Sequence, residues 1–262
     1  SEVADNVIDF IKRRANTDQP FFVNFWGKAN HFWGAHPDFR DTPAQTNTSS
    51  QMVEHDYNTG RILKTLTDLG IAENTLVIWS SDNGPMYTIH PHGGYSLLPG
   101  GKGETKEGGI HVPAIAWWPG MIEPDQDPLD IIQITDFFTT IASITGAMDG
   151  IPTDRVIDGI DQSGLLLLGE GKGRRDYAFH YNRDKLEAVR KDQVKLNLKP
   201  TNPGFHFYEV YNLYHDPAER FPNEAQNGIW AGPGITKMIQ EHMIQIKKYP
   251  HRVPKSYYRD FD

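Results

Sequence analysis

Short apolar runs alternate along the first part of the chain with segments whose apolar residues recur at helical spacing. Each run has the length of a buried strand and ends in polar or Pro-Gly sequence, whereas the periodic segments are long enough for helices. The predicted strands are residues 20–26, 75–80 and 112–118. The predicted helices are residues 2–15, 49–69 and 136–145. This alternation predicts an α/β sheet with helices covering both of its faces.

After about residue 172 the pattern changes, because apolar and polar residues begin to alternate. Alternation of this kind is typical of antiparallel strands with one face in solvent. Strands are predicted at residues 177–181, 188–198 and 205–212, followed by a helix at residues 235–247. We therefore expect a large α/β domain over residues 1–172 and a small antiparallel subdomain with a terminal helix over residues 173–262.

The composition narrows the kinds of chemistry that this chain can carry. Its 262 residues include no cysteine, which excludes disulfides, cysteine-based metal sites and a cysteine nucleophile within the chain. The net charge is -8, with 34 acidic and 26 basic residues, which argues against a broad phosphate-binding surface. The basic runs are short and are expected to be solvated faces: Lys12-Arg13-Arg14 and Lys172-Gly173-Arg174-Arg175. The apolar runs are also far shorter than the about 20 residues of a membrane-spanning helix. We expect neither nucleic-acid binding nor a membrane span.

Two polar features follow predicted strands. The first is Asp82-Asn83, directly after the strand at residues 75–80, a position where ligands commonly bind in open α/β sheets. A carboxylate beside a carboxamide offers hard oxygen ligands for Ca²⁺ or Mg²⁺, although Asp-Asn-Gly is also a common turn sequence. The second feature is the glycine-rich stretch around Lys102. It suits an approaching anion, but it could equally be a flexible surface loop.

A histidine, His31, lies a few residues beyond the predicted strand at residues 20–26. A histidine in this place could protonate a leaving group or donate to an anionic substrate, or it could be structural. All the candidate residues follow strands or lie in adjoining loops. We therefore expect Asp82, Asn83, Lys102 and His31 to converge on one cleft at the carboxyl ends of neighbouring strands.

The order of short motifs along the chain resembles that of the sulfatase family. The resemblance covers about residues 5–225, with the motifs in the family's order and at matching spacings. These motifs are Pro20-Phe21-Phe22-Val23, His31, Asn74-Thr75-Leu76-Val77-Ile78, Ser81-Asp82-Asn83-Gly84, Gly101-Lys102-Gly103, Glu107-Gly108-Gly109, Trp118-Pro119-Gly120 and Val210-Tyr211-Asn212-Leu213. The resemblance implies part of an alkaline-phosphatase-like sandwich, with a mainly parallel sheet and flanking helices.

Membership of this family would also give each candidate residue a role. Sulfatases bind one divalent cation, usually Ca²⁺, through Asp and Asn side chains, and Asp82 and Asn83 match the later pair of these ligands. Lys102 matches a lysine that contacts the sulfate, and His31 matches a histidine that contacts the sulfate or its ester oxygen. The implied activity is hydrolysis of sulfate esters with a formylglycine nucleophile and the divalent cation.

Three family features are missing from this sequence: the earlier pair of acidic metal ligands, the Cys/Ser-x-Pro/Ala-x-Arg signature that becomes formylglycine, and a nearby Lys-x-His pair that helps to bind sulfate. All three belong upstream of the family's Pro-Phe-Phe strand. We therefore expect the chain to be the C-terminal part of a sulfatase, inactive and with an incomplete Ca²⁺ site when alone. We also expect it to pair with the missing half, or to self-associate, through an exposed sheet edge. The resemblance suggests a periplasmic, secreted or lysosomal location for the complete protein.

Two other classes of protein stay open on the sequence. A phosphodiesterase or phosphonate monoester hydrolase of the same superfamily needs similar electrostatics around its phosphorus centre. A non-catalytic binding module on the sulfatase scaffold would also lack a nucleophile. The sequence does not specify which sulfate ester would be the substrate.

Overall fold

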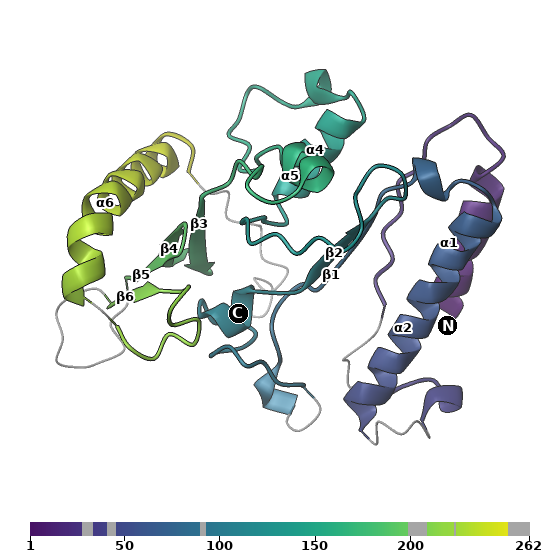
Figure 1. Cartoon of the computed structure of the whole chain (residues 1–262), viewed down its shortest axis with the longest axis horizontal. Helices are drawn as coiled ribbons and strands as arrows, with labels where there is room; N and C mark the ends of the chain where they lie inside the picture. The colour runs from purple at the N-terminus through teal and green to yellow at the C-terminus, as the bar shows by residue number, and fades with distance from the viewer. Residues whose placement is uncertain (28–33, 41–45, 90–92, 199–208, 223, 251–262) are drawn as a thin grey trace, which may run out of the picture. The chain divides into compact units, whose positions relative to one another are not determined.

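The protein is described by a computed structural model over residues 1–27, 34–40, 46–89, 93–198, 209–222 and 224–250 (Figure 1). The chain divides into two compact units, Ser1–Asp125 and Gln126–Asp262, and each unit has its own hydrophobic core. The domain boundary expected near residue 172 lies inside the second unit, after the helix α5 (Ser163–Leu168) and just before its antiparallel sheet begins.

Two helices packed side by side lead the first unit, α1 (Glu2–Arg14) and α2 (Asn47–Asp68) (Figure 1). The helix α2 begins at residue 47 rather than at the predicted residue 49. The reason is its cap, because the hydroxyl of Thr46 accepts a hydrogen bond of 3.1 Å from the backbone N–H of Ser49. At the other end Gly70 adopts φ +69°, as predicted for a residue that follows a helix.

The predicted second and third strands form, each shorter than expected. They are β1 (Val77–Ser80) and β2 (Ala114–Trp117), which pair antiparallel with Val77 opposite Trp117 and Ser80 opposite Ala114. One core lies between this sheet and the two helices. It comprises buried Val7, Ile11, Leu66 and Ala72, surrounded by Phe10, Phe21, Phe25, Ile62, Leu69, Ile71, Val77 and Trp117. Removal of these side chains from water holds the helices on the sheet.

The prediction of a strand at residues 20–26 is wrong for the part of the chain that the structure describes. These residues take part in no strand ladder there, and five of the seven are exposed. Phe21 and Phe25 pack on the core, whereas Phe22 and Trp26 are 69% and 82% exposed. A strand needs a neighbouring strand for its backbone hydrogen bonds, and the described residues supply none at this place.

The expected parallel pairing is also not observed, since every strand pair among the described residues is antiparallel. The chain still combines helices and sheets in both units, so the α/β class holds while the pairing differs. Short helices complete the two units: η1 (Pro37–Phe39), η2 (Ala72–Asn74), η3 (Tyr87–Ile89), α3 (Glu107–Ile110) and η4 (Met148–Gly150). No helix in the described ranges is both long and apolar enough to cross a membrane.

A half-buried histidine, His55 on α2, connects the helix to two other segments of the first unit. Its Nε2 accepts a hydrogen bond of 2.9 Å from the indole N–H of Trp79 on β1. Its ring stacks on Phe25, with 5.8 Å between the ring centroids. Gly27 allows this approach, because a Cβ at that position would lie only 2.6 Å from His55 Nδ1. Burial lowers the pKa of His55, since the charged imidazolium loses solvation.

We predict that this histidine makes the first unit sensitive to acid. The unfolded chain binds a proton at His55 near pH 6.5, whereas the folded chain binds it only at lower pH. The contribution of His55 is therefore fully present above pH 6.5 and is lost as the pH falls below that value. Urea denaturation, measured at several pH values from neutral to acidic, should show this loss. It should be weaker in His55→Gln and unchanged in His215→Gln, whose side chain is exposed.

The second unit joins a pair of helices to a four-stranded sheet. The helices α4 (Asp136–Ile144) and α5 pack together, and the sheet follows them in the chain. Its strands are β3 (Tyr177–Asn182), β4 (Lys185–Lys191), β5 (Val194–Asn197) and β6 (Glu209–Asn212), adjacent in chain order. The last helix, α6 (Glu224–Lys248), lies against this sheet (Figure 1). Its Ile235 is buried with Val189, Leu196 and Val210.

This sheet confirms the predicted antiparallel arrangement and corrects one of its strands. Residues 188–198 were predicted as a single strand but contain a tight turn between β4 and β5. Asp192 in this turn adopts φ +50°, a conformation that Asp and Asn tolerate better than most side chains. The final helix begins at residue 224 instead of residue 235. Of the predicted strand at residues 205–212, only residues 209–212 lie within the described part.

Candidate functional site

The turn after β1 carries the two predicted metal ligands. The hydroxyl of Ser80 donates to Pro113 O at 3.0 Å, and the hydroxyl of Ser81 donates to Asn83 O at 3.1 Å. The side-chain amide of Asn83 donates to Gly84 O at 2.8 Å. These bonds fix the turn, with Asp82 exposed and Asn83 half-buried.

The glycine-rich stretch folds back against this turn. The N–H of Gly84 donates to Gly109 O at 3.0 Å, and the N–H of Lys102 donates to Pro85 O at 2.9 Å. A Cβ on Gly84 would lie 1.7 Å from Gly108 O, so any larger residue would force the two segments apart. The structure thus brings Asp82-Asn83 and Lys102 into one loop cluster, although about 20 residues separate them in the sequence.

Glycine is needed at the C-terminal end of this stretch because backbone segments pack closely there. A Cβ on Gly108 would lie 2.4 Å from both Leu98 O and Gly100 O. A hydrogen bond of 2.7 Å from Gly108 N to Pro99 O fastens the same crossing. Residues 98–109 therefore form a loop whose backbone packs closely on itself.

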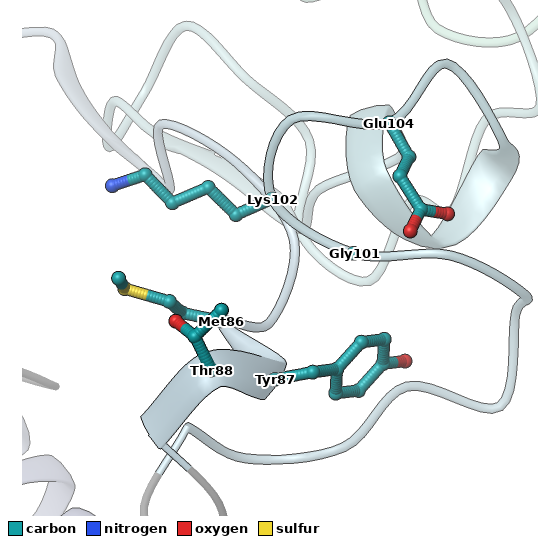
Figure 2. A pocket seen from close by; sticks show the side chains of 6 residues that line it. All are labelled: Met86, Tyr87, Thr88, Gly101, Lys102 and Glu104. Atoms are coloured by element: carbon teal, nitrogen blue, oxygen red, sulfur yellow. The ribbon is translucent and has the colours of Figure 1, made fainter.

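A pocket of about 300 Å³ opens beside Lys102 (Figure 2). Its lining comprises Met86, Tyr87, Thr88, Gly101, Lys102 and Glu104. In Figure 2 the Lys102 side chain extends to one side of the loop over Met86, while the Glu104 carboxylate lies on the opposite side, nearer Tyr87. The pocket therefore has a cationic side and an acidic, aromatic side.

The oxygen atoms of Asp82 and Asn83 suit a hard divalent cation. The amide nitrogen of Asn83 is bound to Gly84 O, so its carboxamide oxygen is the atom that can serve as a ligand beside the Asp82 carboxylate. A Ca²⁺ ion takes about 6–8 oxygen ligands. Within the described ranges, no group of three or more His, Cys, Asp and Glu side chains is arranged to hold a metal. The pair fits part of such a site.

The other predicted site residue, His31, lies outside the described residues. Convergence of Asp82, Asn83 and Lys102 on one loop cluster agrees with the expectation, while their chemical roles remain predictions. The described lining of the pocket adds Met86, Tyr87, Thr88 and Glu104, which sequence reasoning missed. They carried no local signal, because the pocket exists only once the loop has folded against the turn.

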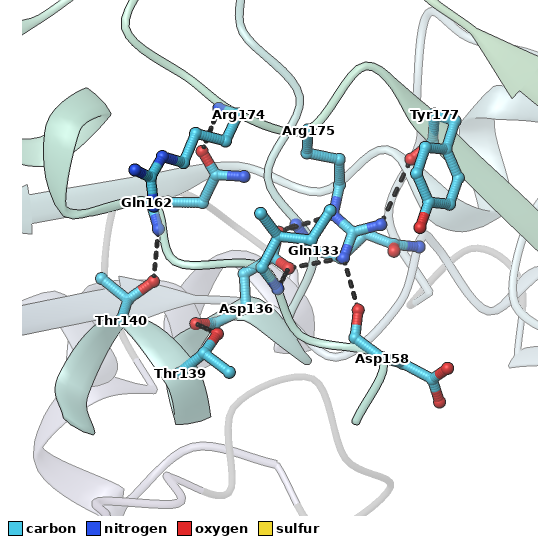
Figure 3. Close-up of polar contacts among 10 residues, drawn as sticks. Gln133, Asp136, Thr139, Thr140, Asp158, Gln162, Arg174, Arg175 and Tyr177 are labelled. Atoms are coloured by element: carbon cyan, nitrogen blue, oxygen red, sulfur yellow. Dashed lines mark hydrogen bonds and ion pairs between the residues drawn. The ribbon is translucent and has the colours of Figure 1, made fainter. Parts of the chain in front are cut away.

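A second polar cluster, in the other unit, is structural in character (Figure 3). The Asp136 carboxylate receives two hydrogen bonds from the Arg175 guanidinium, of 2.8 and 2.6 Å, and both side chains are almost fully buried. The carboxylate also accepts from the backbone N–H groups of Gln133 and Ile160, at 2.9 and 2.8 Å. The sequence predicted Asp136 only as the start of a helix. It predicted the short basic run that contains Arg175 as a solvated face, which is wrong for Arg175, since its side chain is buried against Asp136.

The first unit thus combines an exposed lysine with a neighbouring turn that offers two oxygen donors. The model of the sulfatase family matches residues 1–147. The N-acetylgalactosamine-6-sulfatase of Canis lupus familiaris is 35% identical over an alignment of 268 positions. The alignment covers 90% of this chain and 50% of that relative. This chain belongs to the sulfatase family.

Two further comparisons also match this chain to sulfatases. The steryl-sulfatase of Rattus norvegicus is 37% identical over 194 residues, which cover 71% of this chain and 33% of that relative. The crystal structure of the PsFucS1 sulfatase from Pseudoalteromonas sp. superposes with a TM-score of 0.87 at 31% identity, covering 95% of this chain and 53% of that one. The chain thus spans about half the length of PsFucS1 and of the N-acetylgalactosamine-6-sulfatase.

Proposed function

We propose that this chain is the C-terminal part of a sulfatase and that the complete protein hydrolyses sulfate esters. The observation that carries the proposal is the loop cluster, in which Asp82-Asn83 and Lys102 are held together in a chain of the sulfatase family. The proposal assigns Lys102 to the sulfate oxygens, His31 to the sulfate or the ester oxygen, and Asp82 and Asn83 to the cation.

Each of these residues has a task that its chemistry suits. The exposed ammonium of Lys102 can approach an anion and offset the charge that its oxygens carry as the ester bond breaks. The backbone bond from Lys102 to Pro85 keeps the lysine next to the metal-ligand turn. When bound, a divalent cation, Ca²⁺ in this proposal, supplies further positive charge for the sulfate oxygens. Asp82 and Asn83 would hold it from one side.

The remaining oxygen ligands and the nucleophile, a formylglycine in this family, would come from residues outside this chain. The chain carries neither the signature for formylglycine nor the earlier pair of acidic ligands. Alone, it should therefore bind Ca²⁺ weakly and lack an attacking group. The expected periplasmic, secreted or lysosomal location follows from the family and stays a prediction.

We also propose that Phe22 and Trp26 are covered in the complete protein. They project from an extended segment whose other side chains, Phe21 and Phe25, are already packed on a core. Large exposed aromatic rings on a segment that pairs with no described strand are typical of a surface that another part of the protein covers. About half of the PsFucS1 fold has no counterpart in this chain, which supports that missing part as the partner. Self-association would be the substitute when the partner is absent.

One comparison tests the activity. The complete protein, expressed from the full gene, should hydrolyse 4-nitrophenyl sulfate, lose this activity with a chelator and regain it with Ca²⁺. The 262-residue chain, verified by mass, should show no turnover under the same conditions, because it lacks the attacking group.

Three other outcomes would each contradict the proposal in a different way. Turnover by the pure chain, proportional to its concentration, would show that the nucleophile lies within it. Hydrolysis of 4-nitrophenyl phosphate or a phosphonate monoester, without hydrolysis of the sulfate, would identify a phosphoryl enzyme of the superfamily instead. A complete protein with no activity on any of these esters would favour the binding module.

A further inference from the structure

The names of the relatives include both a sugar sulfatase and a steryl-sulfatase, so membership of the family does not fix the alcohol part of the substrate. The pocket beside Lys102 bears on this question, because its two sides differ in chemistry (Figure 2). Lys102 extends from one side, where an anionic group would gain from its charge. The other side presents a phenol ring and a carboxylate, neither of which suits an anion.

The phenol ring belongs to Tyr87 and is held rigidly. Its hydroxyl donates to Gly100 O at 3.0 Å, and its ring lies against the backbone of Gly101. A Cβ on Gly101 would lie 2.8 and 2.9 Å from two ring carbons, so glycine is needed for this contact. The Tyr87 side chain is nevertheless 42% exposed. A fixed and partly exposed ring offers apolar contact area at a low cost in conformational entropy.

The carboxylate belongs to Glu104, which the same loop positions. Its backbone N–H donates to Gly101 O at 2.9 Å, and its Oε2 would lie 2.8 Å from a Cβ on Gly100. The Tyr87 hydroxyl and the Glu104 carboxylate therefore both lie close to Gly100. An ionised carboxylate accepts hydrogen bonds from hydroxyl groups and repels a second anion. The loop that presents Lys102 to an anion thus also places a negative charge across the pocket from it.

We infer that this pocket holds the alcohol part of the substrate, and that it fits a sugar ring that carries one sulfate and free hydroxyl groups elsewhere. The inference rests on the proposed sulfatase activity. The sulfate would lie toward Lys102, the apolar face of the ring against Tyr87, and the hydroxyl groups toward Glu104. A second sulfate at the Glu104 side would meet a like charge, so Glu104 selects against doubly sulfated rings. Tyr87 and Glu104 act on specificity and not on the bond that breaks.

The test uses the complete enzyme and three substrates: a hexosamine 6-sulfate, the same sugar with a second ring sulfate, and methyl sulfate, which has no ring. Glu104→Gln should raise kcat/KM for the doubly sulfated sugar about fivefold relative to the singly sulfated one, the size of one solvent-screened charge contact. Tyr87→Ala should raise KM for the sugar sulfate about tenfold and leave methyl sulfate unchanged, since only the sugar has a ring to stack. Glu123→Gln, an exposed glutamate of the same unit, is the matched control.

The results separate this inference from the proposed activity. A wild-type enzyme that hydrolyses neither these three esters nor 4-nitrophenyl sulfate would overturn the sulfatase proposal, and the subsite with it. Hydrolysis of 4-nitrophenyl sulfate but of neither sugar sulfate would overturn the subsite alone. An enzyme that hydrolyses them, but keeps the same ratio between singly and doubly sulfated sugar in Glu104→Gln and in Glu123→Gln, would overturn the subsite alone. Tyr87→Phe checks for misfolding, because it keeps the ring and should keep the low KM. If it raises KM as much as Tyr87→Ala does, stacking is not the cause.

Discussion

In the complete enzyme, Lys102→Ala is expected to lower kcat/KM for a sulfate ester by about 100- to 1000-fold, the range observed when one preorganised charge-stabilising group is removed. The loop cluster gives the reason. The backbone bond from Lys102 to Pro85, at 2.9 Å, fixes the lysine beside the metal-ligand turn. The exposed ammonium is therefore carried on a fixed backbone next to the turn, where we expect it to meet the negative charge that grows on the sulfate oxygens. Steady-state kinetics with 4-nitrophenyl sulfate measure the loss.

The matched control is Lys106→Ala, in the same glycine-rich loop. It removes the same charge four residues further on, at the residue that precedes α3. If Lys102 acts by position, the control should stay within about threefold of the wild type. Equal losses in the two variants would mean that the loop acts through its net charge alone. Lys102→Arg should recover only part of the activity, because a planar guanidinium does not reproduce a compact ammonium.

In the second unit, Asp136→Ala is expected to lower the free energy of unfolding by about 3–5 kcal/mol, the usual cost of breaking a buried ion pair. The substitution leaves the Arg175 guanidinium, which is 1% exposed, without its carboxylate (Figure 3). It also removes the acceptor for the backbone N–H groups of Gln133 and Ile160. Urea denaturation of the 262-residue chain, followed by circular dichroism, measures the change.

An exposed ion pair provides the comparison. Asp154 and Arg155 pair through two hydrogen bonds of 2.7 and 2.8 Å, yet both side chains are more than half exposed. Asp154→Ala should leave the denaturation midpoint within error, because solvent screens such pairs. The double variant Asp136→Ala, Arg175→Met should be more stable than Asp136→Ala, since no buried charge is then left unpaired. Equal effects of Asp136→Ala and Asp154→Ala would show that burial is not the source of the stabilisation.

The sequence predicted well those features that depend on neighbours in the chain. The helices α1, α2 and α4, and the strands β1 and β2, follow from periodicity and apolar runs, and the stop at Gly70 follows from its freedom to adopt a positive φ. It also predicted the sulfatase family, because the motifs keep their order and spacing. The prediction failed at residues 20–26, an apolar run of strand length that has no partner strand among the described residues.

The candidate site, too, was only partly predictable from the sequence. Residue type and position singled out Asp82, Asn83 and Lys102 as candidates, because oxygen donors and a lysine have recognisable chemistry. Their roles came from the resemblance to the sulfatase family and remain predictions. Only the tertiary structure decided that the glycine loop crosses the turn, where Gly84 meets Gly108 with no room for a side chain. That crossing also creates the pocket, and with it the positions of Tyr87 and Glu104.

Residues that are far apart in the sequence but in contact in the fold show why such features could not be predicted. Asp136 and Arg175 lie 39 residues apart, and nothing in the sequence around either residue indicates the other. Local periodicity, capping and turn preferences act over a few residues, so the sequence by itself determined most of the helices and strands, the family and the candidate residues. Which segments meet depends on burying apolar area and satisfying polar groups across the whole fold, and these are properties of the tertiary structure alone.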